Sequence, residues 1–182
     1  MIWQRPDGPR RRDLARAGAR LRPGVLALLA ATVVAAEPRY PLMGQAAPDF
    51  ALHAAAGENV RLSEHRGEVI VVSFWSSRCT PCRSQLTSLN RSYQTYRSAG
   101  LQVYGVGVDD DPAQSREFAH SAQVGFAMLL DPAKGVARSY EVDELPMTVL
   151  IDRNGLIRYV LRDYSQANDT LYLQELRALL NE

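Results

Sequence analysis

The chain has few of the side chains that bind metals. Its two cysteines, Cys79 and Cys82, are separated by two residues, and its three histidines, His53, His65 and His120, are scattered along the chain. A structural zinc site needs four ligands at characteristic spacings, which this set does not provide. We therefore expect no metal site, and no cofactor other than the cysteine pair itself.

Clustered positive charge is also missing from most of the chain. Residues 1–36 carry seven arginines and two acids, whereas residues 37–182 carry 14 basic and 18 acidic side chains. Nucleic-acid binding depends on clustered cations that contact phosphates, so a mildly acidic domain argues against a nucleic-acid partner. The chain also lacks internal repeats and low-complexity tracts. Its 182 residues leave room for one domain of ordinary size and an extension.

The N-terminal apolar run, residues 25–36, is too short to span a bilayer as an ideal helix, which takes about 20 residues. It follows an arginine-rich stretch and ends at Ala36 in small residues that suit signal peptidase. We predict a signal peptide over residues 1–36, with an uncleaved membrane anchor as the alternative. A proline-containing linker over residues 37–48 and a domain over residues 49–182 are expected to follow. This organisation predicts export, most simply to a bacterial periplasm.

Strand and helix patterns alternate along the domain. Residues 69–75 are almost continuously apolar, which is typical of a strand buried on both faces, and a helical pattern follows from about residue 80 to 98. Further elements are expected as a hairpin at 50–62, strands at 101–108, 126–130, 148–151 and 156–161, and helices at 112–123, 132–140 and the C-terminus. This order predicts an α/β sandwich.

Both cysteines lie where the strand at 69–75 gives way to a helix. A thiol in the first turn of a helix faces unpaired N–H groups and the positive end of the helix dipole. Both favour the thiolate, which is the nucleophile. Pro81 fits the same turn, where its missing N–H costs nothing. We predict that Cys79 attacks a substrate disulfide and that Cys82 resolves the mixed disulfide. A static disulfide is the alternative, but it would close a loop too short to constrain much of the unfolded chain.

Four sequence blocks together resemble the periplasmic TlpA/ResA-like thiol–disulfide oxidoreductases. They are residues 47–52 with 62–67, residues 74–83 around the cysteines, residues 145–148, and residues 151–155. The resemblance extends over roughly residues 44–180, in the order and spacing of that family. It implies a thioredoxin-like sandwich with an N-terminal β-hairpin and a central extra strand–helix insertion.

The resemblance also implies a surface that receives the partner protein. Leu145-Pro146 is similar to a loop whose cis-proline lies opposite the cysteines, where it exposes backbone to an incoming peptide and keeps metals from the thiols. We assign Leu145, Pro146, Met147 and Trp75 to this partner surface, although Trp75 suits a core position equally well.

Arg78 precedes Cys79 at a position where the resembled proteins usually have tryptophan. A cation beside the sulfur lowers the pKa of the thiol, so we predict that Arg78 tunes Cys79. A solvated arginine without effect on the sulfur is the alternative.

Two acids of the resembled folds are missing here. Ser73 and Gln85 occupy positions where thioredoxin or the resembled family has a carboxylate that accepts the proton of the second thiol. By strand position alone, Glu68 and Asp109 are candidates to replace it, and a solvated residue at a strand end is the simpler interpretation of each.

These observations favour an exported enzyme that exchanges its dithiol with protein substrates. By resemblance, its task is the reduction of substrates such as apocytochrome c or copper-centre assembly proteins, with electrons from a membrane-bound donor. A peroxiredoxin-like peroxidase is an alternative, but Val72 stands where that class needs proline. A Sco-like copper chaperone is another, but that class has three residues between its cysteines and a distant histidine.

Overall fold

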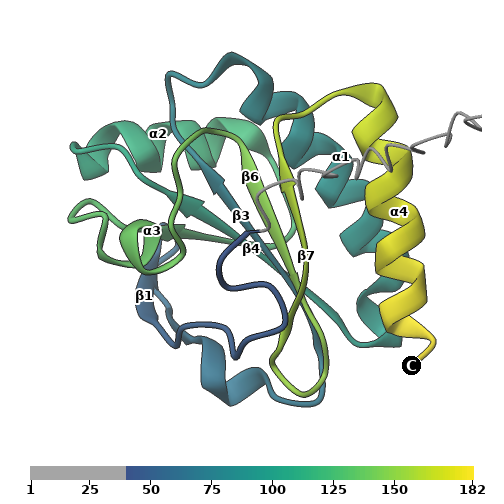
Figure 1. Ribbon diagram of the computed structural model, residues 1–182. Coiled ribbons are helices and arrows are strands. Elements are labelled where there is room, and N and C mark those ends of the chain that lie inside the picture. Colours follow the sequence, from purple (N-terminus) through teal and green to yellow (C-terminus); the bar gives the residue numbers. More distant parts are fainter. Residues whose placement is uncertain (1–39) are drawn as a thin grey trace, which may run out of the picture. The chain divides into compact units, whose positions relative to one another are not determined.

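A seven-stranded mixed sheet forms the centre of the molecule in the computed structural model, which describes residues 40–182 apart from the side chain of Gln166 (Figure 1). The strand order is β2-β1-β5-β4-β3-β6-β7. The strands are β1 (Ala51–Ala54), β2 (Asn59–Arg61), β3 (Val69–Trp75), β4 (Leu101–Gly107), β5 (Ala127–Leu130), β6 (Met147–Ile151) and β7 (Ile157–Arg162). The helices are α1 (Thr80–Tyr96), α2 (Pro112–Ala122), α3 (Gly135–Ser139) and α4 (Gln166–Leu180), with short 3₁₀ turns at Leu62–His65 and Arg97–Ala99.

Strand β3 occupies the middle of the sheet, as its apolar sequence predicts. It pairs in parallel with β4 and antiparallel with β6, and all seven of its residues are buried. β-branched and aromatic side chains suit such a position because they pack well on a pleated surface. Complete burial of each large side chain contributes about 1.5–3 kcal/mol relative to exposure. The central strand therefore provides a rigid support for the loop that follows Trp75.

The side chains of β3 alternate between two hydrophobic clusters, one on each face of the sheet. Val71 and Trp75 pack with apolar residues of α1, α2 and α4. Val72 and Phe74 pack on the opposite face with residues of α3 and of the segment before β1. The predicted α/β sandwich is confirmed. Strand β5 and helix α3 are the additional strand and helix, and in the sequence both come after β4 and before β6.

The ends of the helices follow their local sequence. Asp111 caps α2 by accepting a hydrogen bond from the Ala113 N–H, and Gly100 adopts a φ of 90° where the chain turns from the 3₁₀ segment into β4. The helix expected at 132–140 is shorter than predicted, since α3 covers only Gly135–Ser139. Asp131 holds its start by accepting hydrogen bonds from the Gly135 and Ala137 N–H groups.

Residues 40–48 belong to the folded domain, which corrects the predicted linker over its described part. Tyr40 and Ala47 are buried, and Ala47 N–H donates to the Gly155 carbonyl at 2.9 Å. Ile157 N–H donates to the Gln45 carbonyl, so this segment runs beside the β6–β7 turn. The prolines in the segment do not prevent docking, because neighbouring residues supply the hydrogen bonds.

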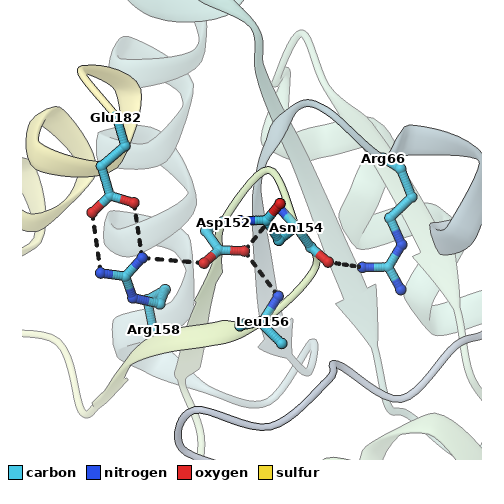
Figure 2. A network of polar contacts seen from close by, with 6 residues as sticks. All are labelled: Arg66, Asp152, Asn154, Leu156, Arg158 and Glu182. Carbon is cyan, nitrogen blue, oxygen red and sulfur yellow. Dashed lines mark hydrogen bonds and ion pairs between the residues drawn. The ribbon is translucent and has the colours of Figure 1, made fainter.

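The predicted turn between β6 and β7 contains Asn154, and Asp152 organises it (Figure 2). One oxygen of Asp152 accepts hydrogen bonds from the Asn154 and Leu156 N–H groups, and the other lies 3.1 Å from Arg158 Nη1. Arg158 also contacts Glu182 near the C-terminus at 2.8 Å. The turn is thus tied to the end of the chain.

The predicted signal peptide or anchor and the domain boundary at residue 36 lie outside the described residues. Among residues 40–182, no helix has both the length and the apolar character needed to cross a membrane.

Candidate active site

Cys79 and Cys82 form a disulfide at the start of α1, with their sulfurs 2.02 Å apart. Cys79 is the residue that immediately precedes the helix, and Cys82 lies in its first turn. The Cys79 N–H donates to the Ser76 carbonyl at 3.1 Å, so residues 76–79 form a turn that carries the chain from β3 into α1. We call residues 76–79 the redox turn. The unpaired N–H groups of the first helical turn point toward this end of α1.

The two cysteines differ in exposure, as the sequence predicts. Cys79 is half-buried, whereas Cys82 is 0% exposed and packs in the cluster beneath α1. Of the two cysteines, Cys79 is therefore the one that a large partner can reach. Its sulfur can attack a disulfide of the partner, or a thiolate of the partner can attack it. Cys82 can reach only a sulfur that is already bonded to Cys79.

The loop before β6 lies beside this disulfide. Met147, the first residue of β6, pairs with Phe74 near the end of β3, and the Leu145–Pro146 peptide bond is cis. Pro146 is buried, and Leu145 is half-buried against both hydrophobic clusters, one of which also includes Cys79.

A groove of about 470 Å³ lies between this loop and the redox turn. Its walls come from the redox turn, the end of β4, α3 and residues 142–145. Charged side chains line it, and these are Arg78, Asp109, Lys134, Arg138, Asp143 and Glu144. Lys134 lies 2.6 Å from Asp110, and this hydrogen bond lowers the pKa of the Asp110 carboxyl, with a weaker contribution from Arg78. The groove therefore presents both signs of charge.

Asp109 fixes the redox turn from the end of β4. Its carboxylate accepts hydrogen bonds from the Ser77 N–H at 3.0 and 3.1 Å and from the Ser77 hydroxyl at 3.0 Å. A fourth hydrogen bond comes from the Ser115 hydroxyl of α2 at 2.8 Å. Asp109 is 3% exposed and Ser77 is half-buried, so these contacts lie at the base of the redox turn.

Three neutral polar side chains form a closed hydrogen-bonded set one helical turn beyond Cys82. The Ser73 hydroxyl donates to Gln85 Oε1 at 3.0 Å, Gln85 Nε2 donates to Thr148 Oγ1 at 2.7 Å, and the Thr148 hydroxyl lies 3.3 Å from Ser73 Oγ. All three residues are buried. Each partner is satisfied without a charge, so this set offers Cys82 no carboxylate.

A larger cavity of about 740 Å³ lies elsewhere, between the β1–β2 hairpin, β4 and α2. None of its lining residues belongs to the redox turn or to the loop before β6. The described residues contain no group of three or more potential ligands that could hold a metal ion.

Comparison with known proteins adds to this geometry. The model of the AhpC/TSA family matches residues 43–160. The chain is 32% identical over 119 residues to thiol-disulfide oxidoreductase ResA of Geobacillus kaustophilus, which covers 65% of this chain and 68% of that protein. It is 30% identical over 114 residues to ResA of Bacillus subtilis, covering 63% and 64%.

Two solved structures are similar in fold to this chain. A putative thiol:disulfide interchange protein DsbE from Chlorobium tepidum superposes with a TM-score of 0.73 at 33% identity, covering 76% of this chain and 97% of that one. A putative protein disulfide isomerase from Bacteroides thetaiotaomicron gives 0.71 at 27% identity, covering 77% and 91%. The chain belongs to the AhpC/TSA family, among its ResA/TlpA-like thiol–disulfide oxidoreductases.

In this ResA/TlpA-like protein, three residues assigned to the partner surface are buried. Pro146 is buried, and Trp75 and Met147 are both 0% exposed. Trp75 stacks on Phe118 of α2 with ring centroids 4.7 Å apart, and Arg83 lies over the Phe118 ring at 4.6 Å. Trp75 and Met147 support the site from within the core, and Leu145 remains the accessible apolar residue of the predicted set.

The structure also distinguishes between Glu68 and Asp109, the two acids that the sequence offered as possible proton acceptors for the second thiol. Glu68 precedes β3 at the edge of the sheet opposite the redox turn, where it contacts His65 and Gln102. Asp109 lies next to the redox turn. Its contact with Ser77 could not be read from the sequence, because it joins residues 32 apart, although an acid directly after a strand beside the cysteine strand is a usable signal.

Proposed function

We propose that this oxidoreductase reduces disulfides in exported protein substrates. In the first step, the Cys79 thiolate attacks a substrate disulfide, forms a mixed disulfide and displaces one substrate thiolate. In the second step, the Cys82 thiol loses its proton and attacks Cys79 Sγ, which releases the second substrate thiolate. The two substrate sulfurs take up two electrons and two protons, and Cys79 and Cys82 are left as the disulfide.

The difference in exposure between the two sulfurs carries this proposal. Cys79 is half-buried and Cys82 is 0% exposed, which suits one sulfur to the attack and the other to the resolving step. The groove beside Cys79, with Leu145 at its wall, can hold an extended segment of a protein substrate. The relatives named ResA and DsbE are thiol–disulfide exchange proteins by name, which supports the same chemistry.

We place this activity outside the cytoplasm, on the basis of the signal-like residues 1–36. Substrates such as apocytochrome c or copper-centre assembly proteins, and a membrane-bound donor that restores the dithiol, fit a reductase in that compartment. The enzyme needs no cofactor in this scheme beyond its own cysteine pair.

Reduction of insulin disulfides by the dithiol form tests the proposal. The wild-type protein is expected to reduce insulin catalytically with dithiothreitol as donor, and the Cys82→Ala variant to accumulate a mixed disulfide through Cys79. Failure of the wild type to reduce insulin, combined with rapid peroxide consumption or tight copper binding by the dithiol form, would overturn it.

A further inference from the structure

Asp109 combines features that are costly to keep in a protein interior. Its carboxylate is 3% exposed, and the four hydrogen bonds that reach it come from Ser77 and Ser115, which are neutral donors. Its oxygens accept hydrogen bonds from the Ser77 backbone N–H, a group that can only donate. A buried charge without a cation to compensate it is unfavourable, and such groups concentrate at functional sites.

Among the described residues, two other aspartates are buried. Asp131 is 3% exposed and caps α3 through the Gly135 and Ala137 N–H groups, whereas Asp152 is paired with a cation. Asp152 is 4% exposed and also accepts backbone N–H groups at a strand end, but Arg158 neutralises it (Figure 2). It also follows β6 at the sheet edge opposite the redox turn, because Ile151 pairs with Ile70 near the start of β3. Asp152 therefore serves as a structural comparison for Asp109.

The position of Asp109 places its charge beside the attacking sulfur. Its carboxylate is hydrogen-bonded to Ser77, and the Cα atoms of residues 77 and 79 are at most about 7 Å apart, so the carboxylate lies within roughly 10 Å of the Cys79 backbone. A negative charge at this range opposes formation of a thiolate. Water and salt screen this charge less than an exposed one, because the carboxylate is buried and held by hydrogen bonds.

Arg78 acts in the opposite direction but more weakly. It is exposed, so water and salt screen its charge, and part of its field acts on Asp110. The remaining charged groups that line the groove beside Cys79 carry both signs, and these are Lys134, Arg138, Asp143 and Glu144. Asp143 is paired with Arg162, and Lys134 with Asp110. Among the charged residues that line this groove, Asp109 is the one that is buried and hydrogen-bonded to the redox turn.

We propose that Asp109 sets the reducing strength of the cysteine pair by disfavouring the Cys79 thiolate. A stabilised thiolate stabilises the reduced form and makes a pair more oxidising. The Asp109 carboxylate acts against that stabilisation, so it favours the disulfide and makes the dithiol a better electron donor. This inference rests on the proposed reductase function and names the residue that supports its direction.

The test compares Asp109→Asn with Asp152→Asn in the full chain. Asparagine keeps one acceptor for Ser77 and can donate to the Ser115 hydroxyl, so it removes the charge with little change in shape. For Asp109→Asn we expect the Cys79 thiolate titration to move to lower pH by about half a pH unit or more. At pH 8 a shift of half a pH unit should move the equilibrium with glutathione toward the dithiol by up to about threefold, which is about 14 mV for a two-electron couple.

Asp152→Asn should leave both quantities unchanged while it lowers stability. If Asp109→Asn does not fold, Asp109→Ser carries the same test. An unchanged titration and potential in a folded neutral variant would overturn the role of Asp109, even if the wild type reduces insulin. Failure of the wild type to exchange with glutathione at all would instead count against the proposed function.

Discussion

Replacing Gln85 by glutamate would put a carboxyl group where the site has a neutral amide. Gln85 is 5% exposed and links Ser73 to Thr148, and it lies one helical turn beyond Cys82. A protonated glutamate fits this set, because its O–H can donate to Thr148 Oγ1 in place of the amide. The ionised form fits poorly, since no cation takes part in these hydrogen bonds.

The size and sign of the effect of Gln85→Glu on stability follow from the burial of this residue. Burial of this kind raises a carboxyl pKa by about three pH units, from about 4.3 in the unfolded chain to about 7. A raised folded-state pKa leaves stability intact below about pH 4.3 and removes it as pH rises through the folded-state value. Each pH unit by which the pKa rises is worth about 1.4 kcal/mol, so the loss of stability reaches about 4 kcal/mol at pH 8.

Urea denaturation of wild type and Gln85→Glu at pH 4.5 and pH 8 measures this difference. The variant should be close to wild type at pH 4.5 and about 4 kcal/mol less stable at pH 8. Gln94→Glu, an exposed position on the same helix α1, is the matched control and should change stability by less than about 0.5 kcal/mol at either pH. Equal destabilisation of Gln85→Glu at both pH values would refute the reasoning.

Three further predictions address the redox turn, the core beneath it and the N-terminal segment. Arg78→Ala should raise the pKa of Cys79 in a thiolate absorbance titration, by on the order of a few tenths of a pH unit because Arg78 is exposed; an unchanged or lower pKa would contradict this. Gly107→Ala would place a Cβ 2.7 Å from Trp75 Cζ2 and should cost about 1–3 kcal/mol in urea denaturation, whereas an unchanged midpoint would show that the tryptophan moves freely. Burial raises the pKa of Tyr40 to about 12, so its contribution to stability is complete below about pH 10 and is lost between pH 10 and 12. Tyr40→Phe should remove most of that alkaline loss of stability, and a pH profile identical to that of wild type would contradict the assignment.

The central elements of the fold could be predicted because local sequence and tertiary position agree there. Residues 69–75 are apolar on both faces and form the central strand with the predicted bounds. The helix after the cysteines begins at Thr80 as expected, since Pro81 and the end of the strand determine its start. Element ends were less predictable, as with α3, where a side chain outside the helix, Asp131, holds the start at Gly135.

Some features of the candidate site could likewise be predicted from the sequence, and others could not. The cysteine spacing and its place before a helix predict which sulfur is accessible, and the exposure of Cys79 and Cys82 agrees. The assignment of Trp75 to the partner surface was wrong, because an aromatic residue at a strand end can turn inward when another helix covers it, as α2 does. The contact of Asp109 with Ser77 depends on sheet order, which periodicity alone does not specify.

The identity of the cysteine that reacts first tests the account most directly. The reduced protein is treated with less than one equivalent of iodoacetamide at several pH values, and mass spectrometry locates the modified sulfur. We predict that Cys79 is alkylated at least ten times faster than Cys82, and that alkylation of Cys79 alone abolishes disulfide exchange. Modification of Cys82 first, or exchange that persists after Cys79 is blocked, would contradict the assignment of Cys79 as the attacking sulfur.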